Sequence, residues 1–195
     1  MDSGKVIKTI EAKLDEIGYK LHKHVLNASY FGVPQHRERV YFVGLRKDAG
    51  SDQVLSCKEP KPTNKKIYLE DILEKNVDPD LFIEREDKVI DFEDKEHDLA
   101  PIRIGHVNKG GQGERIYSTK GHAITLSAYG GGVGARTGLY LVGDNVRKLS
   151  INECKTLMGF PKSHFVSPGI QGYQQLGNAV IPSMVSHVYD SIKVA

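Results

Sequence analysis

Cysteine is scarce in this chain, because only Cys57 and Cys154 occur among 195 residues and they form no Cys-x-x-Cys pair. Two distant cysteines argue against a disulfide scaffold or a zinc site and are typical of a reduced, cytosolic protein. The eight histidines form no His-Glu-x-x-His motif, no apolar run could span a membrane, and the start MDSGKVIKTI lacks a signal-peptide core. We therefore expect a cytoplasmic protein with no membrane partner and no bound metal.

The chain also has little excess charge of either sign. Its formal net charge of +2 is too small to indicate a nucleic-acid partner, so any basic surface has to come from local clustering. With 39% hydrophobic residues the chain can bury a core. Composition therefore leaves one domain, or one small domain plus part of another.

Glycine is concentrated in the stretch NKGGQGERIYSTKGHAITLSAYGGGVGARTG, from Asn108 to Gly138. Glycine admits a positive φ and lets the backbone approach a partner closely. The stretch contains no GxxxxGK[ST] phosphate loop, and Ile116 stands where a dinucleotide fingerprint needs its third glycine. These patterns argue against nucleotide binding, and loose solvated turns remain the alternative for the glycines.

Hydrophobic periodicity predicts an α/β layer near the N-terminus. The apolar residues of 3–18 recur at helical spacing, and Gly18 is a suitable stop. The segment 19–28 has the pattern of a half-buried strand. After a turn at 31–34, the run VYFVGL at 40–45 predicts a strand buried on both faces. Residues 58–66, KEPKPTNKK, predict a linker.

The rest of the chain predicts a small β region followed by helices. A short helix is expected at 69–73, and three strands of an antiparallel, loop-rich region are expected at ERIYS, AITLSAY and GLYLV. Ser150 and Glu153 form a capping box that opens a helix ending near Gly159. A terminal helix is expected to carry one apolar stripe, with the motif QLGNAV at its entrance: Ile181, Val185, Val188 and Ile192.

The segment VPQHRERVYFVG carries the first candidate chemistry. Along an extended chain Gln35, Arg37 and Arg39 point to one side, because successive side chains alternate. Two guanidiniums and an amide suit phosphate oxygens or a base carbonyl. On spacing alone, an arginine pair that neutralises nearby carboxylates remains the alternative.

Several blocks together resemble one enzyme family. NASYFGVPQHRERVYFVG closely resembles the QxRxR region of DNA cytosine-5 methyltransferases, and RKLSINECKTLMGFP and GYQQLGNAVIPSMV resemble the family's next two blocks, in the same order. NKGGQGERIYST and ITLSAYGGG are similar to the target-recognition region of a family member that recognises GCGC. The resemblance covers essentially the whole chain.

The resemblance implies the C-terminal part of an S-adenosylmethionine (SAM)-dependent methyltransferase. The expected fold is α/β, an incomplete Rossmann-like layer, plus a small β-rich target-recognition domain of loop-rich antiparallel strands. Residues 1–58 would belong to the catalytic layer, 59–149 to the target-recognition domain, 150–176 to a hinge and conserved helix, and 177–195 to the GNAV motif and a terminal helix returning to the catalytic domain.

The family's catalytic motif maps onto the arginine segment. The resemblance implies that Arg39 reaches the target cytosine, with Arg37 and Gln35 supporting it. The cytosine is expected to be flipped out, because its reacting carbon cannot be reached inside a stacked duplex.

The resemblance further implies that seven residues contact DNA: Gln112, Glu114, Arg115, Thr125, Tyr129, Gly131 and Gly132. Gln112 would fill the space left by the flipped base, and Arg115 would read guanine through O6 and N7. Glu114 can accept from a cytosine amino group, Thr125 would contact a phosphate, and Gly132 would allow close backbone contact.

The GNAV motif maps onto the family's cofactor contact. Asn178 would lie beside SAM, at a position before a helix that suits the methionine carboxylate. Ala179 stands where relatives often have serine, which removes a hydroxyl and one cofactor hydrogen bond. On the residues alone, Gly177 and Asn178 would be an ordinary turn and N-cap.

The nucleophile that this chemistry needs is missing from the motifs. Cytosine methylation requires a thiolate and a carboxylic acid at the base, which the family supplies from Pro-Cys and Glu-Asn-Val motifs. Neither motif is present, nor is the family's glycine motif for SAM, and both cysteines are expected to be structural. We expect a DNA-recognition half that binds double-stranded DNA, binds SAM weakly or not at all, and is inactive without an N-terminal catalytic half. A DNA-binding or assembly module without catalysis is the alternative. Apolar faces that the absent half would cover should favour instability or self-association.

Overall fold

The structure, a computed structural model, describes residues 3–48, 55–90 and 96–194. The chain divides into two compact units. The end unit consists of Met1–Leu26, Glu38–Lys61 and Val185–Ala195, and the middle unit of Asn27–Arg37 and Pro62–Met184. In the described part of the chain, no helix combines the length and the apolar character needed to cross a membrane.

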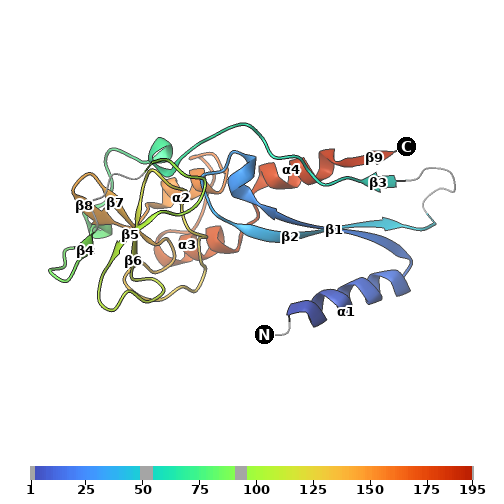
Figure 1. Cartoon of the computed structure of the whole chain (residues 1–195), viewed down its shortest axis with the longest axis horizontal. Coiled ribbons are helices and arrows are strands. Elements are labelled where there is room, and N and C mark those ends of the chain that lie inside the picture. Colours follow the sequence, from blue (N-terminus) through green and yellow to red (C-terminus); the bar gives the residue numbers. More distant parts are fainter. Residues whose placement is uncertain (1–2, 49–54, 91–95, 195) are drawn as a thin grey trace. The chain divides into compact units, whose positions relative to one another are not determined.

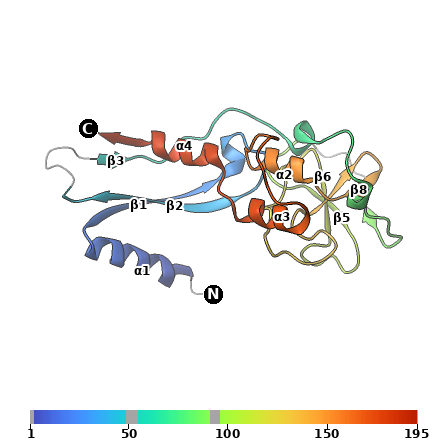
Figure 2. The same cartoon turned by 180° about the vertical axis from the view of Figure 1, so that it is seen from behind.

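The end unit is built from one helix, two short sheets and the end of a second helix. Its elements are α1 (Ser3–Glu16), β1 (Tyr19–Asn27), β2 (Glu38–Arg46), β3 (Leu55–Cys57), the end of α4 (Pro182–Asp190), and β9 (Ile192–Val194). β1 pairs with β2, and β3 pairs with β9 in antiparallel register. Figures 1 and 2 show β1 and β2 between α1 on one side and β3, β9 and α4 on the other. The predicted first helix and first strand are confirmed.

The prediction that 40–45 forms a strand buried on both faces was wrong about burial. β2 forms there, but Val43 is its only buried residue and Val40 is 39% exposed. Val6 in α1 and Ile17 just after it are also exposed, whereas Ile7, Ile10 and Leu14 are half-buried. The physical reason is that two-stranded sheets and one short helix cover too little area to remove these side chains from water.

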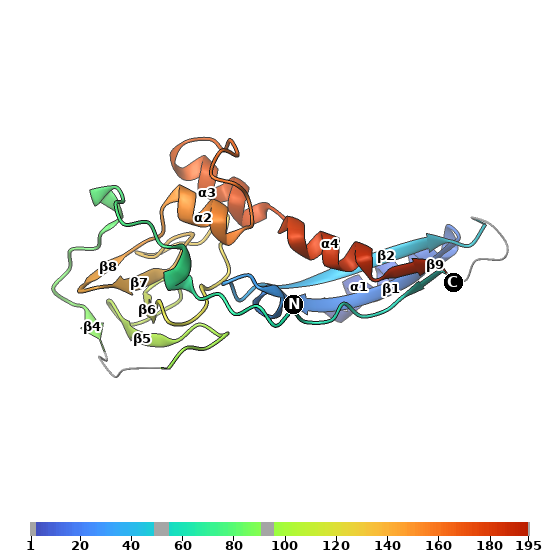
Figure 3. The same ribbon diagram turned by 90° about the horizontal axis from the view of Figure 1, so that it is seen from above.

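The middle unit contains a five-stranded sheet in the order β4-β5-β6-β7-β8. Its strands are β4 (Val89–Ile90), β5 (Arg103–His106), β6 (Arg115–Ser118), β7 (Leu139–Val142) and β8 (Asn145–Arg147). Its helices are η1 (Ala28–Phe31), η2 (Leu69–Ile72), η3 (Pro79–Leu81), α2 (Ile151–Leu157) and α3 (Gly169–Asn178). α2 and α3 lie on the same side of the sheet (Figure 3). One apolar cluster forms the core of the sheet: Ile104, Val107, Ile116, Leu139 and Val146.

The expected antiparallel region is a mixed sheet instead. β6 and β7 form where ERIYS and GLYLV predicted strands, but they pair in parallel, with Ile116 opposite Leu139. Parallel neighbours need a crossover connection, and residues 119–138 supply it. AITLSAY, at 123–129, is not a strand, apart from one isolated bridge between Ala123 and Gln35.

The C-terminal helices begin and end differently from the prediction. The capping box is confirmed, since Ser150 Oγ accepts from the Glu153 N–H and the Glu153 carboxylate accepts from the Ser150 N–H. Asn178, however, ends α3 instead of standing at a helix entrance, and α4 begins only at Pro182. Ile192, expected in the terminal helix, lies in β9.

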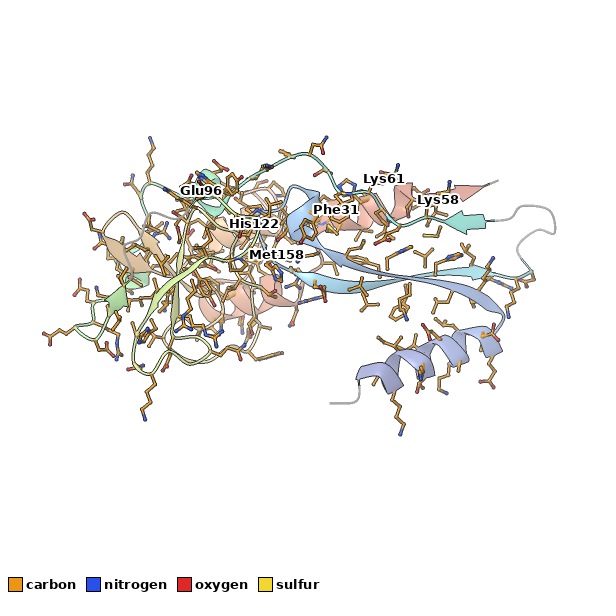
Figure 4. All side chains as sticks on the ribbon, viewed as in Figure 1. Phe31, Lys58, Lys61, Glu96, His122 and Met158 are labelled. Carbon is orange, nitrogen blue, oxygen red and sulfur yellow. The ribbon has the colours of Figure 1, made fainter. Side chains whose placement is uncertain are left out.

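Residues 27–37 pack with the middle unit, although residues 1–58 were expected in one domain. Three buried side chains of that unit, Phe31, His122 and Met158, are labelled in Figure 4. His122 Nδ1 lies 2.9 Å from Ser29 Oγ, which ties η1 to the crossover between β6 and β7. Burial lowers the pKa of His122 to about 4, so its ring is neutral at physiological pH.

Candidate nucleic-acid interface

The two glycine clusters lie against each other in the middle unit. The Gly134 N–H donates to the Gly113 carbonyl at 2.7 Å. Gly113 has a left-handed φ of +85°, and a Cβ there would overlap the Gly131 carbonyl oxygen. At Gly134 a Cβ would come within 3.0 Å of the Gly113 carbonyl. The first role of these glycines is therefore to let two loops pack backbone to backbone.

An open cleft of about 360 Å³ lies beside this contact. Its lining residues come from both glycine loops and the crossover: Gln112, Gly113, Ile124, Thr125, Ser127, Tyr129, Gly130, Gly131, Gly134, Arg136 and Gly138. Four of the seven expected DNA contacts are among them, namely Gln112, Thr125, Tyr129 and Gly131. Tyr129 is 81% exposed, so an aromatic face is open to a partner. Glu114, Arg115 and Gly132 are not part of the lining.

Glu114 orders the loop that carries Gln112. Its carboxylate accepts from the Gly111 N–H at 2.8 Å and from Asn108 Nδ2 at 2.9 Å. These two donors, the Gly111 amide first, hold the pKa of Glu114 below its usual range. The carboxylate is therefore ionised, and its first partners belong to its own loop.

Arg115 and Gln112 present unused donors. Arg115 is the exposed first residue of β6, opposite His106. In the described part of the chain, no hydrogen bond or ion pair engages the side chain of Arg115 or of Gln112. Both side chains can therefore meet an external acceptor without breaking an internal bond.

Thr125 does not offer the free donor that a phosphate contact needs. Its hydroxyl donates to the His36 carbonyl at 2.6 Å. A phosphate oxygen only accepts hydrogen bonds, so Thr125 could donate to it only by giving up the bond to His36. Gly132 has a φ of +82°, and a Cβ on it would lie 3.2 Å from the Gly113 carbonyl oxygen, so this glycine also serves the contact between the loops.

Arg136 is a cleft residue that sequence reasoning missed. It adopts a left-handed φ of 73°, which is uncommon outside glycine. Its Nε is buried and has no hydrogen-bond partner. The signal available in the sequence was an arginine inside the glycine-rich run GGGVGARTG, whose glycines permit a left-handed backbone.

Gln35 and Arg37 do not form the open polar face that alternation predicted. Gln35 is fully buried, its Oε1 accepts from the Leu126 N–H at 3.3 Å, and its Nε2 lies 3.5 Å from Met158 Sδ. Both residues precede β2, so strand alternation does not govern them.

Arg37 joins the end of α3 to the cleft segment. Its guanidinium donates to the carbonyls of Leu126, Gly177 and Ala179, at 3.4, 3.1 and 2.9 Å. Gly177 packs closely on the same segment, because a Cβ there would lie 2.6 Å from the Ala128 nitrogen. Arg37 is therefore a buried clamp between the GNAV motif and residues 126–128.

Arg39 belongs to the end unit, on β2, whereas Gln35 and Arg37 belong to the middle unit. Its side chain is exposed, and Nη1 donates to the neighbouring Glu38 carbonyl at 2.6 Å. A guanidinium that uses one nitrogen on an adjacent carbonyl keeps most of its donors for a substrate.

Asn178 and Ala179 by themselves do not fit a SAM site. Asn178 is exposed at the last residue of α3, where the helix presents carbonyls and the negative end of its dipole, which disfavours a carboxylate. Ala179 has no polar side chain, and its carbonyl is occupied by Arg37. The side-chain amide of Asn178 is the one polar side chain that these two residues could offer to SAM.

Both cysteines are buried. Burial raises the pKa of Cys154 well above its ordinary value, which is the opposite of what a nucleophile needs. Cys57 Sγ lies 3.2 Å from His24 Nε2 and 3.4 Å from Ser191 Oγ, inside the end unit.

Known proteins resemble this chain along its whole length. It is 40% identical over 190 residues to the type II methyltransferase M.HhaI of Haemophilus parahaemolyticus. The matched region covers 96% of this chain and 57% of that protein. It is 33% identical over 198 residues to the type II methyltransferase M.MspI of Moraxella sp., covering 100% of this chain and 43% of that protein. The chain thus spans about half the length of the curated relatives it matches.

Solved methyltransferases share the fold at low identity. The Entamoeba histolytica methyltransferase EhMeth superimposes with a TM-score of 0.65 at 18% identity, covering 95% of this chain and 57% of that one. The Dnmt2 methyltransferase of S. pombe gives the same score and identity, covering 93% and 59%. The family model for C-5 cytosine-specific DNA methylase matches residues 1–194. On this match and on the ordered motifs, the chain belongs to the C-5 cytosine-specific DNA methylase family.

Proposed function

We propose that this chain is the DNA-recognition half of a DNA cytosine-5 methyltransferase. The complete enzyme would transfer a methyl group from SAM to C5 of a flipped cytosine, within GCGC. The family supports the reaction, and the similarity of residues 108–132 to a GCGC-recognising region supports the site. Type II relatives support a role in restriction and modification.

The observation that carries the proposal is the cleft between the glycine loops. Gln112 and Tyr129 line it with exposed side chains, and Arg115 stands on β6 with its donors unused. Unused polar groups on a rigid, glycine-packed backbone suit base edges, where each missing partner would be costly. We assign Gln112 to the space vacated by the flipped base, Arg115 to a guanine and Glu114 to a cytosine amino group. The duplex would contact the aromatic ring of Tyr129 and the backbone of Gly131 and Gly132.

The roles that we propose for the segments of the chain follow the order of the motifs. We propose a catalytic-layer role for 1–58 and 177–195, target recognition for 59–149 and a hinge for 150–176. In partial support of this, Met1–Leu26, Glu38–Lys61 and Val185–Ala195 form one compact unit, and the glycine-rich stretch lies in the other, together with Asn27–Arg37. Arg39 would contact the flipped cytosine, while Gln35 and Arg37 act through the backbone they hold.

We further propose that the chain is inactive alone and that an N-terminal half, from the same gene or a separate subunit, supplies the nucleophile and most of the SAM site. Buried Cys57 and Cys154, with the raised pKa of Cys154, support this. So does the presence of one polar side chain, that of Asn178, in the pair Asn178 and Ala179. The same facts favour the second candidate, a DNA-binding or assembly module without catalysis.

Binding to duplex DNA tests the recognition proposal. Fluorescence anisotropy with a GCGC duplex and a scrambled duplex of equal length should show tighter binding to GCGC at fixed salt. A salt series separates this preference from the counterion-release term that every sequence shares. Equal, steeply salt-dependent affinities would contradict sequence reading by this chain, and no binding to either duplex would contradict the proposed function.

Addition of the N-terminal half separates the two candidate functions. Methyl transfer from labelled SAM to GCGC DNA is expected only when both halves are present. Transfer by this chain alone would refute its inactivity. Binding without transfer in the reconstituted mixture would favour the module without catalysis.

Replacing Arg115 with alanine should cost about 1–3 kcal/mol of binding free energy at one guanine of the site. The difference in binding free energy between the parent and the variant should disappear on a duplex in which that guanine pair is replaced, because neither protein can then make the contact. Arg103→Ala, an exposed arginine on the neighbouring strand β5, is the control and should affect all duplexes alike. An equal loss for Arg115→Ala on matched and mismatched duplexes would contradict base reading.

A further inference from the structure

The cleft between the glycine loops holds one positive charge and no negative one. Of the described residues that line it, only Arg136 is charged. Its Nε is buried within the protein and meets no acceptor. A buried donor without a partner is costly, and each such atom in a native structure calls for an explanation, such as an ion or a water molecule at the site. The unmet donor and the unbalanced charge both favour an anion.

Arg136 has a backbone conformation that is unusual for an arginine. A φ of 73° strains a residue with a Cβ and would suit glycine, which occupies many nearby positions. The conformation is held by neighbouring bonds, because the Arg136 carbonyl accepts from the Ser127 N–H at 2.9 Å and the Gly138 N–H donates to Gly134 at 2.9 Å. The turn therefore has glycine-like geometry, and an arginine held in it is consistent with a role for the guanidinium.

Two residues beside Arg136 in the cleft lining, Thr125 and Ser127, carry aliphatic hydroxyl groups. Thr125 uses its proton on the His36 carbonyl. Ser127 lines the cleft with an exposed side chain, close to the backbone of Arg136. A guanidinium fork with a serine hydroxyl beside it matches the oxygens of a phosphate group.

We propose that Arg136 binds a phosphodiester group of the DNA backbone, with Ser127 as a second donor. This inference rests on the proposed function, since it requires duplex DNA in the cleft. It makes Arg136, and not Thr125, the donor that anchors the backbone. Phosphate contacts position a protein on DNA without reading sequence, so Arg136 contributes to affinity and not to the choice of GCGC.

The test is Arg136→Gly, which removes the guanidinium and relieves the backbone. The variant should fold at least as stably as the parent, since glycine adopts this φ without strain. Its affinity should fall by about tenfold, and equally, on GCGC and scrambled duplexes. The slope of log affinity against log salt should become shallower by about 0.9, the loss of one phosphate contact. Arg136→Lys keeps the charge and should keep the slope, with intermediate affinity.

Neutral linkages locate the contact. Single methylphosphonate linkages are placed in turn along the duplex. At one linkage the substitution should weaken DNA binding by the parent protein but leave binding by Arg136→Gly unchanged. Arg46→Gln is the control: this exposed arginine pairs with Asp48 and does not line the cleft, so that linkage should keep its effect.

Three other results of these binding experiments would each contradict one part of the proposal. If the parent binds DNA while Arg136→Gly keeps both affinity and slope, the phosphate contact is wrong and the proposed function stands. If Arg136→Gly loses affinity only on GCGC, the residue reads bases and the assignment to phosphate fails. If the parent binds no duplex, the proposed function falls and this inference falls with it.

Discussion

Replacing Glu153 with glutamine is expected to lower the free energy of unfolding by about 3–5 kcal/mol. Glu153 and Arg147 form a buried ion pair, 0% and 1% exposed, with N–O distances of 2.6 and 2.8 Å. The carboxylate also accepts the backbone N–H groups of Glu74 and Ser150, at 2.8 and 2.7 Å. The substitution would leave the Arg147 charge buried without its counterion and turn an amide N–H₂ towards existing donors.

Urea unfolding followed by far-UV circular dichroism measures this loss. The matched control is Glu11→Gln, which breaks the exposed pair with Lys23 and should change stability by less than about 1 kcal/mol. Replacing the buried pair together, by Arg147→Met with Glu153→Leu, should recover much of the loss because no unpaired charge remains. Similar, small effects of Glu153→Gln and Glu11→Gln would show that the buried pair does not hold β8 to α2.

Replacing Arg37 with methionine is expected to destabilise the chain by about 3 kcal/mol, because three inward-facing carbonyls lose a charged donor. The same change should loosen the cleft, since Arg37 holds the Leu126 carbonyl beside Thr125 and Ser127. We therefore expect weaker binding to GCGC and scrambled duplexes together. Urea unfolding and anisotropy on the same preparation measure both effects.

Arg39→Met is the matched control, two residues away. Arg39 is exposed and uses its neighbour's carbonyl, so its loss should change stability by less than about 0.5 kcal/mol. In the reconstituted enzyme, however, Arg39→Met should reduce methyl transfer with little effect on DNA affinity. Equal stability losses for the two variants would contradict the clamp role of Arg37, and unchanged methyl transfer would contradict the role proposed for Arg39.

Elements whose interactions are local followed from the sequence. The capping box at Ser150 and Glu153 needs only two residues three positions apart, and it formed as predicted. α1 and β1 also formed where periodicity placed them. β6 and β7 were predicted as strands, but their parallel pairing was not, because pairing depends on a crossover whose path no local pattern encodes.

The segment 123–129 shows how tertiary contacts override a strand pattern. Its alternating residues predicted a strand, yet side chains and carbonyls of 35–37 take its polar groups. The His36 N–H donates to the Ala123 carbonyl, Gln35 accepts from the Leu126 N–H, and Thr125 donates to His36. Once these groups are satisfied, a neighbouring strand is not needed.

The family, the order of the motifs and the residue types of the candidate interface could be read from the amino-acid sequence, because residue identity and short spacing carry them. Which of those polar groups are free depends on the folded chain. It buried Gln35 and Arg37, engaged the Thr125 hydroxyl and left the Arg136 Nε without a partner. The physical reason is that a polar group is available to a ligand only if no protein atom already satisfies it, and those atoms come from segments far apart along the chain.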